Sequence, residues 1–219
     1  MRSKLLEVYD RLYRHFGPQH WWPAETWFEV IIGAILTQSI SWTGVEKAMA
    51  SLKSAGALDP AELRRLSLPE LAKLIYPAGY YNAKARKIKA FVQHLGERHA
   101  DDLDRLFSQE TPALRQELLS IYGIGEETAD SIILYAACKP VFVIDAYTRR
   151  VVSRLGLAPA EDSYGAYQRL FADKLPSDTQ LFNEYHALLV AQGKHVCRKV
   201  PLCERCPLKT VCEYGRGRV

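Results

Sequence analysis

Four cysteines lie close together near the end of the chain. They are Cys197, Cys203, Cys206 and Cys212, separated by five, two and five residues. Thiolates are soft ligands, and proteins use them for zinc, cuprous copper and iron–sulfur clusters. The spacing therefore predicts a metal site to which all four cysteines contribute.

Two kinds of metal site fit these cysteines. Structural zinc usually takes its ligands as two closely spaced pairs, whereas only Cys203 and Cys206 form such a pair here. A [4Fe–4S] cluster accepts more scattered ligands, and Pro207 after Cys206 is similar to the Cys-Pro step of ferredoxins. We therefore predict an iron–sulfur cluster, with zinc as the alternative. Disulfide bonds are disfavoured because the total of five cysteines is odd and we see no signal peptide.

The composition is that of a globular protein with a substantial core. The chain has 219 residues, of which 48% are hydrophobic, enough for one large domain or two small ones. No apolar run approaches the roughly 20 residues that a transmembrane helix needs. We therefore expect a soluble, intracellular protein that does not associate with membranes.

Positive charge is concentrated around the cysteines. Residues 194–219 contain seven Lys and Arg but only two Glu, so this segment carries +5 in a chain of net charge +4. The other residues therefore sum to −1. A basic segment of this kind suits contact with a phosphate backbone, although charge can also simply keep a terminal segment solvated.

Helical periodicity extends through nearly the whole chain. We predict helices over residues 5–16, 26–36, 45–52, 83–95, 112–121, 126–137, 146–155 and 178–191. Pro60 and Pro69 stand where the first turn of a helix tolerates proline. Residues 141–144 have the composition of a strand, but this segment is short and isolated. The predicted class is therefore all-α.

The helical pattern also places several individual side chains. In segment 83–95 the apolar positions form one face, and Lys84 with its basic neighbours forms the opposite face. Cys138 follows an apolar helical run and is expected to be buried as a small hydrophobic residue. Trp27 is expected in the core. None of the six histidines has a metal-binding spacing, so we expect them to be surface or core residues.

A glycine-containing turn connects two of the predicted helices. Gly123 and Gly125 allow positive φ and let a phosphate approach the main chain. The helix that follows would offer free N–H groups and its positive dipole end to that phosphate, and Thr128 lies in its first turn. The same glycines could also serve an ordinary turn between two helices.

The sequence is similar to the helix-hairpin-helix DNA glycosylases of the endonuclease III superfamily. The matching segments are Leu36-Thr37-Gln38, Gly79-Tyr80-Tyr81-Asn82-Ala83-Lys84-Ala85, Gly123-Ile124-Gly125-Glu126-Glu127-Thr128-Ala129-Asp130, Val143-Ile144-Asp145 and the four terminal cysteines. Within the superfamily, Trp21-Trp22-Pro23 and Trp42 resemble the 3-methyladenine DNA glycosylase III branch. The likeness extends from about residue 20 to residue 212.

The resemblance implies two helical lobes with a DNA-binding cleft between them. A six-helix barrel with the helix-hairpin-helix would comprise residues 20–137. The second lobe would combine residues 1–19 with residues 138–219 and would contain the cluster loop, residues 197–212.

The sequence departs from the family pattern at three places. The first cysteine gap is five residues instead of six. Glu127 occupies the position of the catalytic lysine of bifunctional members, so Schiff-base chemistry and strand-nicking lyase activity are not expected. Residues 31–35 contain no carboxylate, which argues against the adenine-mismatch branch.

Asp145 is the predicted catalytic residue. Breaking an N-glycosidic bond leaves positive, oxocarbenium-like charge on the sugar. A carboxylate held nearby stabilises that charge and can orient or deprotonate a water. Asp145 also stands at the start of a predicted helix, where it would serve as an N-cap, and the two roles are compatible.

Trp21, Trp22, Pro23 and Trp42 form the predicted base pocket. A glycosylase reaches its target by flipping the base out of the duplex, and aromatic faces then hold that base. N-alkylated purines are cationic, and tryptophan is the best cation–π partner. The alternative role for these tryptophans is packing in the core.

The resemblance also implies residues that contact DNA. Gln38 and Tyr80 would fill the gap left by the flipped base, although Tyr80 could instead be a packed ring in a turn. The other expected DNA-binding residues are Asn82, Lys84, Gly123, Gly125 and Thr128. The cluster would be structural, holding its basic loop for contact with DNA.

The predicted function is excision of N-alkylated purines, chiefly 3-methyladenine, from duplex DNA by a monofunctional glycosylase. One alternative is a glycosylase for uracil, mismatched thymine or oxidised bases on the same fold. Another is a non-catalytic DNA-binding iron–sulfur protein. We expect a cytoplasmic, nucleoid-associated monomer.

Overall fold

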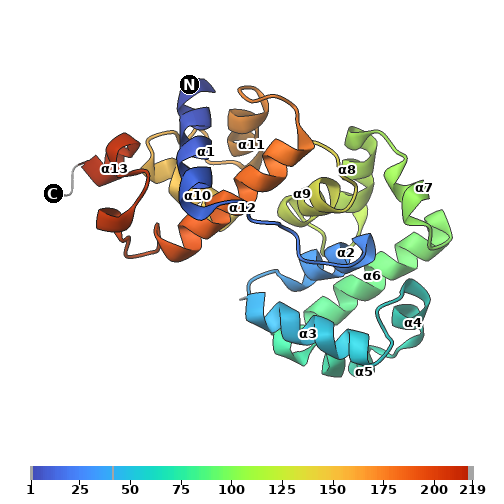
Figure 1. The fold of residues 1–219 in the computed structure, drawn as a ribbon. Helices are drawn as coiled ribbons and strands as arrows, with labels where there is room; N and C mark the ends of the chain where they lie inside the picture. The colour runs from blue at the N-terminus through green and yellow to red at the C-terminus, as the bar shows by residue number, and fades with distance from the viewer. Residues whose placement is uncertain (1, 41, 217–219) are drawn as a thin grey trace. The chain divides into compact units, whose positions relative to one another are not determined.

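A computed structural model describes residues 2–40 and 42–216. The chain divides into two compact units, which we call the terminal unit (Met1–Trp21 with Pro140–Val219) and the central unit (Trp22–Lys139). Helices make up the regular structure of both units, and no strand occurs among the described residues (Figure 1). The predicted all-α class is confirmed.

The central unit is built around a helix that is apolar on nearly every side. α2 (Trp27–Leu36) begins after Thr26, whose hydroxyl accepts a hydrogen bond from the backbone N–H of Glu29 at 3.2 Å. All residues from Phe28 to Leu36 are buried, as expected of a helix surrounded by other elements. The other helices of this unit are α3 (Trp42–Ser54), α4 (Pro60–Arg65), α5 (Leu68–Leu74), the 3₁₀ helix η1 (Tyr76–Ala78), α6 (Tyr81–His99), α7 (Leu103–Phe107), α8 (Thr111–Ser120) and α9 (Glu126–Tyr135).

The long helix α6 connects much of the central unit. It packs against α2, α4 and α5, and α9 packs against both α2 and α8 (Figure 1). α6 begins two residues before the predicted segment 83–95 and ends four residues after it. The predicted site residues of the central unit are therefore positioned by helices that pack against one another.

The short helices α4 and α5 each carry a predicted proline in the first turn. Asp59 caps α4 by accepting hydrogen bonds from the N–H groups of the first turn, and Pro60 is its first residue. Ser67 and Glu70 form a capping box at α5, with Pro69 in the first turn. Each cap satisfies backbone donors that the helix itself leaves without acceptors, so the predicted proline positions are confirmed.

The terminal unit joins segments from both ends of the chain. α12 (Thr179–His195) packs against α1 (Arg2–Phe16) and α10 (Ala146–Arg154). The Tyr185 hydroxyl, on α12, donates a hydrogen bond to the carbonyl of Leu5 at 2.8 Å. The remaining elements are α11 (Tyr164–Ala172), the 3₁₀ helices η2 (Cys203–Arg205) and η3 (Lys209–Val211), and α13 (Glu213–Arg216).

Residues 141–144 are not a strand, contrary to their composition. Two side chains of α11 meet the backbone polar groups that a neighbouring strand would otherwise satisfy. Gln168 Nε2 donates to the carbonyl of Phe142 at 2.9 Å, and the Tyr164 hydroxyl accepts from the N–H of Ile144 at 3.2 Å. The Phe142 ring stacks on Phe171 with a centroid distance of 3.8 Å. The apolar character of the segment therefore reflects burial, not sheet formation.

Two side-chain placements differ from the sequence predictions. Cys138 is exposed, because α9 ends at Tyr135 and the chain turns out of the helix with a φ of +52° at Cys138. Trp27 is also exposed, as the first residue of α2. Within the described part of the chain, no helix combines the length and the apolar character needed to cross a bilayer.

The buried segment around Phe142 gives a prediction for stability. Phe142→Ala should lower the free energy of unfolding by about 3–5 kcal/mol, because it removes a buried ring and leaves a cavity among close-packed aromatic residues. Val200→Ala, at an exposed position of the same unit, should change it by less than about 0.5 kcal/mol. Urea unfolding of both variants measures the difference, and equal midpoints would contradict the packing role of Phe142.

Candidate functional site

The glycine turn joins α8 to α9, as the sequence predicted. Gly123 has a φ of +81°, in the left-handed region that favours glycine. Gly125 differs from the prediction of positive φ, because its φ is −95° and it is the N-cap of α9. Gly125 is exposed, with open space where a Cβ would stand. Its backbone is therefore accessible at the N-terminus of a ten-residue helix.

Three polar side chains hold the turn in place. A Cβ on Gly123 would overlap the aliphatic chain of Lys87, which lies across this residue. The Lys87 ammonium group donates to Gln38 Oε1. Gln38 Nε2 in turn donates to the carbonyl of Gly123 at 3.1 Å and to the hydroxyl of Thr128 at 2.9 Å. The buried Thr128 thus serves the internal structure of the hairpin.

A buried ion pair clamps the two helices of the hairpin together. Arg115 of α8 donates from Nε to Asp130 Oδ1 at 2.7 Å and from Nη2 to Asp130 Oδ2 at 3.1 Å. Asp130 is fully buried, so its charge requires such a partner. This ion pair was not predicted from the sequence. Its only indication there is a carboxylate, Asp130, on the buried face of an apolar helix.

The start of α6 presents two of the predicted DNA-binding residues at the surface. The Tyr80 side chain is prominently accessible, since the residue is 73% exposed, and its backbone has a φ of +45°. Asn82 is exposed in the first turn of the helix. Both side chains are therefore open to a ligand, and DNA contact by them remains a prediction.

Lys84 lies in the interior, so its predicted contact with DNA is wrong. The residue is only 1% exposed, and Nζ donates to the carbonyls of Leu36 and Ala78, each at 2.7 Å. Burial, together with the positive charge of Lys87, lowers the pKa of Lys84 to about 8. Lys84 therefore ties the end of α2 and η1 to α6.

Two of the predicted pocket tryptophans lie together in the central unit. The Trp22 ring meets Trp42 edge-on with a centroid distance of 5.3 Å, and meets Tyr135 at 5.4 Å. A Cβ on Gly33 would stand 3.2 Å from two atoms of the Trp22 indole, so glycine gives the ring its space. We call Trp22, Trp42 and Tyr135 the aromatic cluster.

The aromatic cluster is partly open, and one of its rings is hydrogen-bonded to a carboxylate. Trp22 and Trp42 are both half-buried, and Trp42 Nε1 donates to Glu46 Oε1 at 2.9 Å. Of the other predicted pocket residues, Pro23 is exposed and Trp21 belongs to the terminal unit. Tyr135 was not predicted as a member of this cluster. Its only indication in the sequence is its position as an aromatic residue at the end of an apolar helix.

Asp145 is the N-cap of α10, which confirms one of its two predicted roles. Its Oδ1 accepts a hydrogen bond from the N–H of Thr148 at 2.7 Å. His186 of α12 is buried, and its Nε2 stands 3.9 Å from the same oxygen. Burial lowers the pKa of His186, against the opposing effect of the Asp145 charge. Asp145 is thus held in place beside an imidazole that burial keeps neutral.

All four terminal cysteines line one small cavity in the terminal unit. Arg154 Nη1 approaches Cys197 Sγ at 3.3 Å, and Gln192 Nε2 approaches Cys206 Sγ at 3.1 Å. Burial raises the pKa of Cys206 and of Cys212. The donor set fits a soft-metal centre, because all four cysteines line one cavity and two N–H donors already point at sulfur. Metal binding would displace the thiol protons that burial favours.

The basic residues around the cysteines are mostly at the surface. Those exposed are Lys194, Arg198, Lys199, Arg205 and Arg216. Lys209 instead pairs with Glu204 at 3.0 Å, and Arg218 lies outside the described residues. The predicted basic surface thus remains available at five positions.

Comparison with known proteins identifies the family. The model of the HhH-GPD superfamily of base excision DNA repair proteins matches residues 32–177, and the chain belongs to this superfamily. A Methanocaldococcus jannaschii protein, MJ1434, which is provisionally named a DNA repair glycosylase, is 43% identical over 95% of both chains. Endonuclease III of Sulfolobus acidocaldarius is 31% identical over 85% of this chain and 82% of its own.

Solved structures agree with this assignment. The Helicobacter pylori 3-methyladenine DNA glycosylase MagIII, bound to 1,N6-ethenoadenine, matches with a TM-score of 0.77 and 25% identity over 87% of this chain and 97% of its own. A non-covalent endonuclease III–DNA complex shares the fold, with a TM-score of 0.86 and 23% identity over 100% and 98% of the two chains. The protein is therefore a DNA repair glycosylase of this superfamily.

The interior position of Lys84 predicts a particular dependence of stability on pH. Its pKa is about 8 in the folded protein and about 10.4 in an unfolded chain. Between these values the unfolded chain binds more protons, so the free energy of unfolding rises with pH. Relative to Lys84→Met, the native chain should gain at most about 3 kcal/mol from pH 8 to 10.5. Denaturant unfolding of both proteins across this pH range measures the difference in the free energy of unfolding. A difference that stays constant with pH would contradict the low pKa of Lys84.

Proposed function

We propose that the protein is a monofunctional glycosylase that excises N-alkylated purines of the 3-methyladenine type from duplex DNA. The observation that carries this proposal is the aromatic cluster, in which the Trp22 ring lies over Gly33 and meets Trp42 edge-on. The similarity to MagIII, which is named a 3-methyladenine DNA glycosylase, supports it.

The aromatic cluster suits a cationic base. An alkylated purine carries positive charge, and the faces of indole rings attract cations by about 0.5–2 kcal/mol. The hydrogen bond from Trp42 Nε1 to the Glu46 carboxylate places additional negative charge beside that ring. A cationic base is also a good leaving group, so the reaction does not depend on a strong general acid.

Asp145 would stabilise the sugar during bond cleavage. Its carboxylate is held at the start of α10 by the N–H of Thr148, and a fixed negative charge opposes the developing oxocarbenium charge. The same carboxylate could orient or deprotonate the attacking water. His186, close to Oδ1 and kept neutral by burial, would position the carboxylate without neutralising it.

The proposal of monofunctional chemistry rests on Glu127. This residue is exposed in the first turn of α9, at the position of the lysine that forms the Schiff base in bifunctional members. A carboxylate cannot form an imine with the sugar. The protein would therefore release the base by hydrolysis and leave the strand intact.

DNA would be gripped at the hairpin and the start of α6. The exposed N-terminus of α9 at Gly125 offers N–H groups to a phosphate, and Tyr80 offers an exposed ring to the stack. Gln38 could enter the DNA only by giving up its hydrogen bonds to Gly123 and Thr128. We therefore assign Tyr80 as the principal wedge.

We assign the four terminal cysteines to a [4Fe–4S] cluster, with zinc as the alternative. A [4Fe–4S] cluster is held by four thiolates, and all four of these cysteines line one cavity. When bound, it would cross-link residues 197–212 and so fix the exposed basic residues for contact with phosphates. We propose that the protein acts as a monomer in the cytoplasm, at the nucleoid.

A second candidate is a glycosylase for neutral bases such as uracil, mismatched thymine or oxidised bases. The identity of 31% to endonuclease III of Sulfolobus acidocaldarius favours it. A neutral base would need hydrogen-bond recognition, which indole faces do not supply. Equal turnover of uracil and alkylpurine duplexes would support this candidate over the first.

Replacing Asp145 by asparagine tests the proposed chemistry. Asn is an equally good N-cap, so Asp145→Asn should keep the fold and DNA binding. It should lower release of 3-methyladenine from methylated duplex DNA about 10²–10⁴-fold, because the charge is lost. Chromatography of the freed base measures the rate.

Asp178→Asn is the matched control, because Asp178 is also an N-cap aspartate of the terminal unit and accepts from Leu181 N–H at 2.6 Å. It should retain full activity. Full activity in Asp145→Asn would end the catalytic assignment, and nicked strands or a borohydride-trapped adduct would contradict monofunctional chemistry.

Metal analysis tests the cluster. The native chain purified without oxygen should contain iron and acid-labile sulfide in equal amounts. Cys206→Ser should lose most of both, because a cluster ligand is removed, whereas Cys138→Ser should retain them, since Cys138 is exposed and lies outside the cavity. One zinc per chain that is lost in Cys206→Ser, without sulfide, would show that the alternative is correct.

A further inference from the structure

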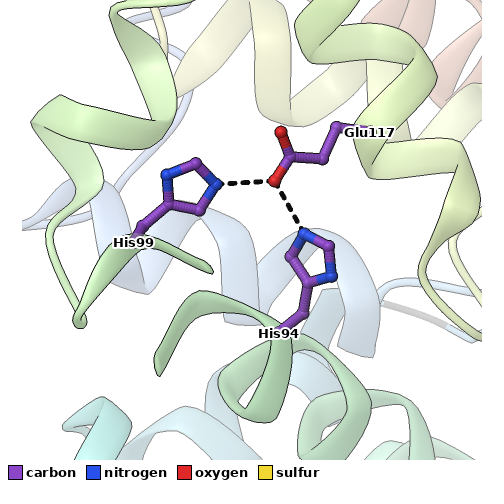
Figure 2. A group of neighbouring side chains, drawn as sticks. All are labelled: His94, His99 and Glu117. Atoms are coloured by element: carbon purple, nitrogen blue, oxygen red, sulfur yellow. Dashed lines mark hydrogen bonds and ion pairs between the residues drawn. The ribbon is translucent and has the colours of Figure 1, made fainter. Parts of the chain in front are cut away.

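A second group of metal-binding side chains occurs in the central unit, far in sequence from the cysteines. His94 and His99 come from the end of α6, and Glu117 comes from α8 (Figure 2). The two imidazole rings point at the same carboxylate oxygen, with Nε2–Oε1 distances of 2.7 Å for His94 and 2.6 Å for His99. The sequence predicted no metal-binding spacing among the histidines, because the third ligand comes from another helix.

The three ligand atoms are close enough to share one ion. They all lie within 4.8 Å of one another, and the side chains of His94, His99 and Glu117 are only 19%, 12% and 15% exposed. Two imidazoles and one carboxylate are a frequent ligand set for zinc. We propose that His94, His99 and Glu117 bind a divalent transition metal of the zinc class.

The surroundings of Glu117 suit this role. Gln109 Nε2 donates to the second oxygen of Glu117, Oε2, at 2.7 Å, and also to the carbonyl of Leu106 at 3.1 Å. Such an outer hydrogen bond orients a ligating carboxylate. Gln109 therefore holds the Glu117 carboxylate in a fixed position beside both imidazole rings.

Binding requires only a small change in this geometry. Zinc lies about 2.0–2.2 Å from imidazole nitrogen and carboxylate oxygen, which places tetrahedral ligand atoms roughly 3.4 Å apart. The two nitrogens would each retreat from Glu117 by less than about 1 Å. Each Nε2 must also be without its proton, which moves to Nδ1 of the ring or to solvent. Water would take the fourth position.

The site would connect α6 to the first helix of the hairpin. α8, which carries Glu117, is the first helix of the hairpin and packs against α9. A metal at this site would cross-link α8 to the end of α6. This role is structural or regulatory and does not depend on the proposed alkylpurine activity, so the two proposals can fail separately.

Difference measurements between matched variants separate this site from the cysteines. The native full-length chain, with its cysteine metal in place, is equilibrated with excess Zn²⁺, passed through a desalting column and analysed for zinc. It should retain one more zinc per chain than Glu117→Gln, which keeps the side-chain volume but removes the charge. His94→Asn should lose the same zinc, whereas His15→Asn, at an exposed histidine of α1, should not.

The affinity and the spectrum provide further measurements. Gln109→Ala should weaken zinc binding about 10–100-fold without abolishing it, because only the outer hydrogen bond is lost. Co²⁺ added to the native chain should give visible absorption bands without the intense thiolate charge transfer that cysteine ligands produce. This spectrum tests the site even if a variant fails to fold.

Equal zinc content in the native chain, Glu117→Gln and His94→Asn would overturn the proposal. Absence of a Co²⁺ spectrum with nitrogen and oxygen ligands would do the same. The three residues would then form only a hydrogen-bonded clamp between α6 and α8. Base release, measured in the same variants, reports separately on the proposed function.

Discussion

The missing side chain at Gly123 is the constraint on which the hairpin depends. Because no Cβ stands there, Lys87 can lie across the turn and reach Gln38. Gln38 then binds both the turn and Thr128 of α9. One glycine thus allows three elements of the central unit to be joined by polar contacts. Arg115 and Asp130 complete the arrangement by closing the two helices on each other.

The fold class and much of the local structure could be predicted because they follow from local rules. Proline in a first turn, Thr and Asp caps, and a glycine at positive φ depend on a few neighbouring residues. The all-α class follows from apolar periodicity. Residues 141–144 could not be assigned correctly, because their backbone partners, Tyr164 and Gln168, lie 20 and 26 residues further along the chain.

The misplaced side chains show where residue type and position conflict. Lys84 stands four residues before the buried Ile88, so helical spacing already placed it on the apolar face, but its charge suggested solvent. The carbonyls of Leu36 and Ala78 that receive its ammonium group could not be foreseen. Likewise, His94 and His99 acquire their shared partner only when α8 packs nearby. Prediction was therefore most accurate where a contact is local, as at the N-cap Asp145, and least accurate where it depends on packing.

Tyr80 combines a left-handed backbone with an almost fully solvated ring. A non-glycine residue in this conformation lowers the stability of the folded chain by about 1–3 kcal/mol. An exposed ring offsets little of this strain, because it buries little apolar surface. Natural selection for stability alone would therefore replace it with glycine or asparagine. An aromatic residue at such a position is a compromise, in which the chain gives up some stability and keeps a ring exposed to solvent.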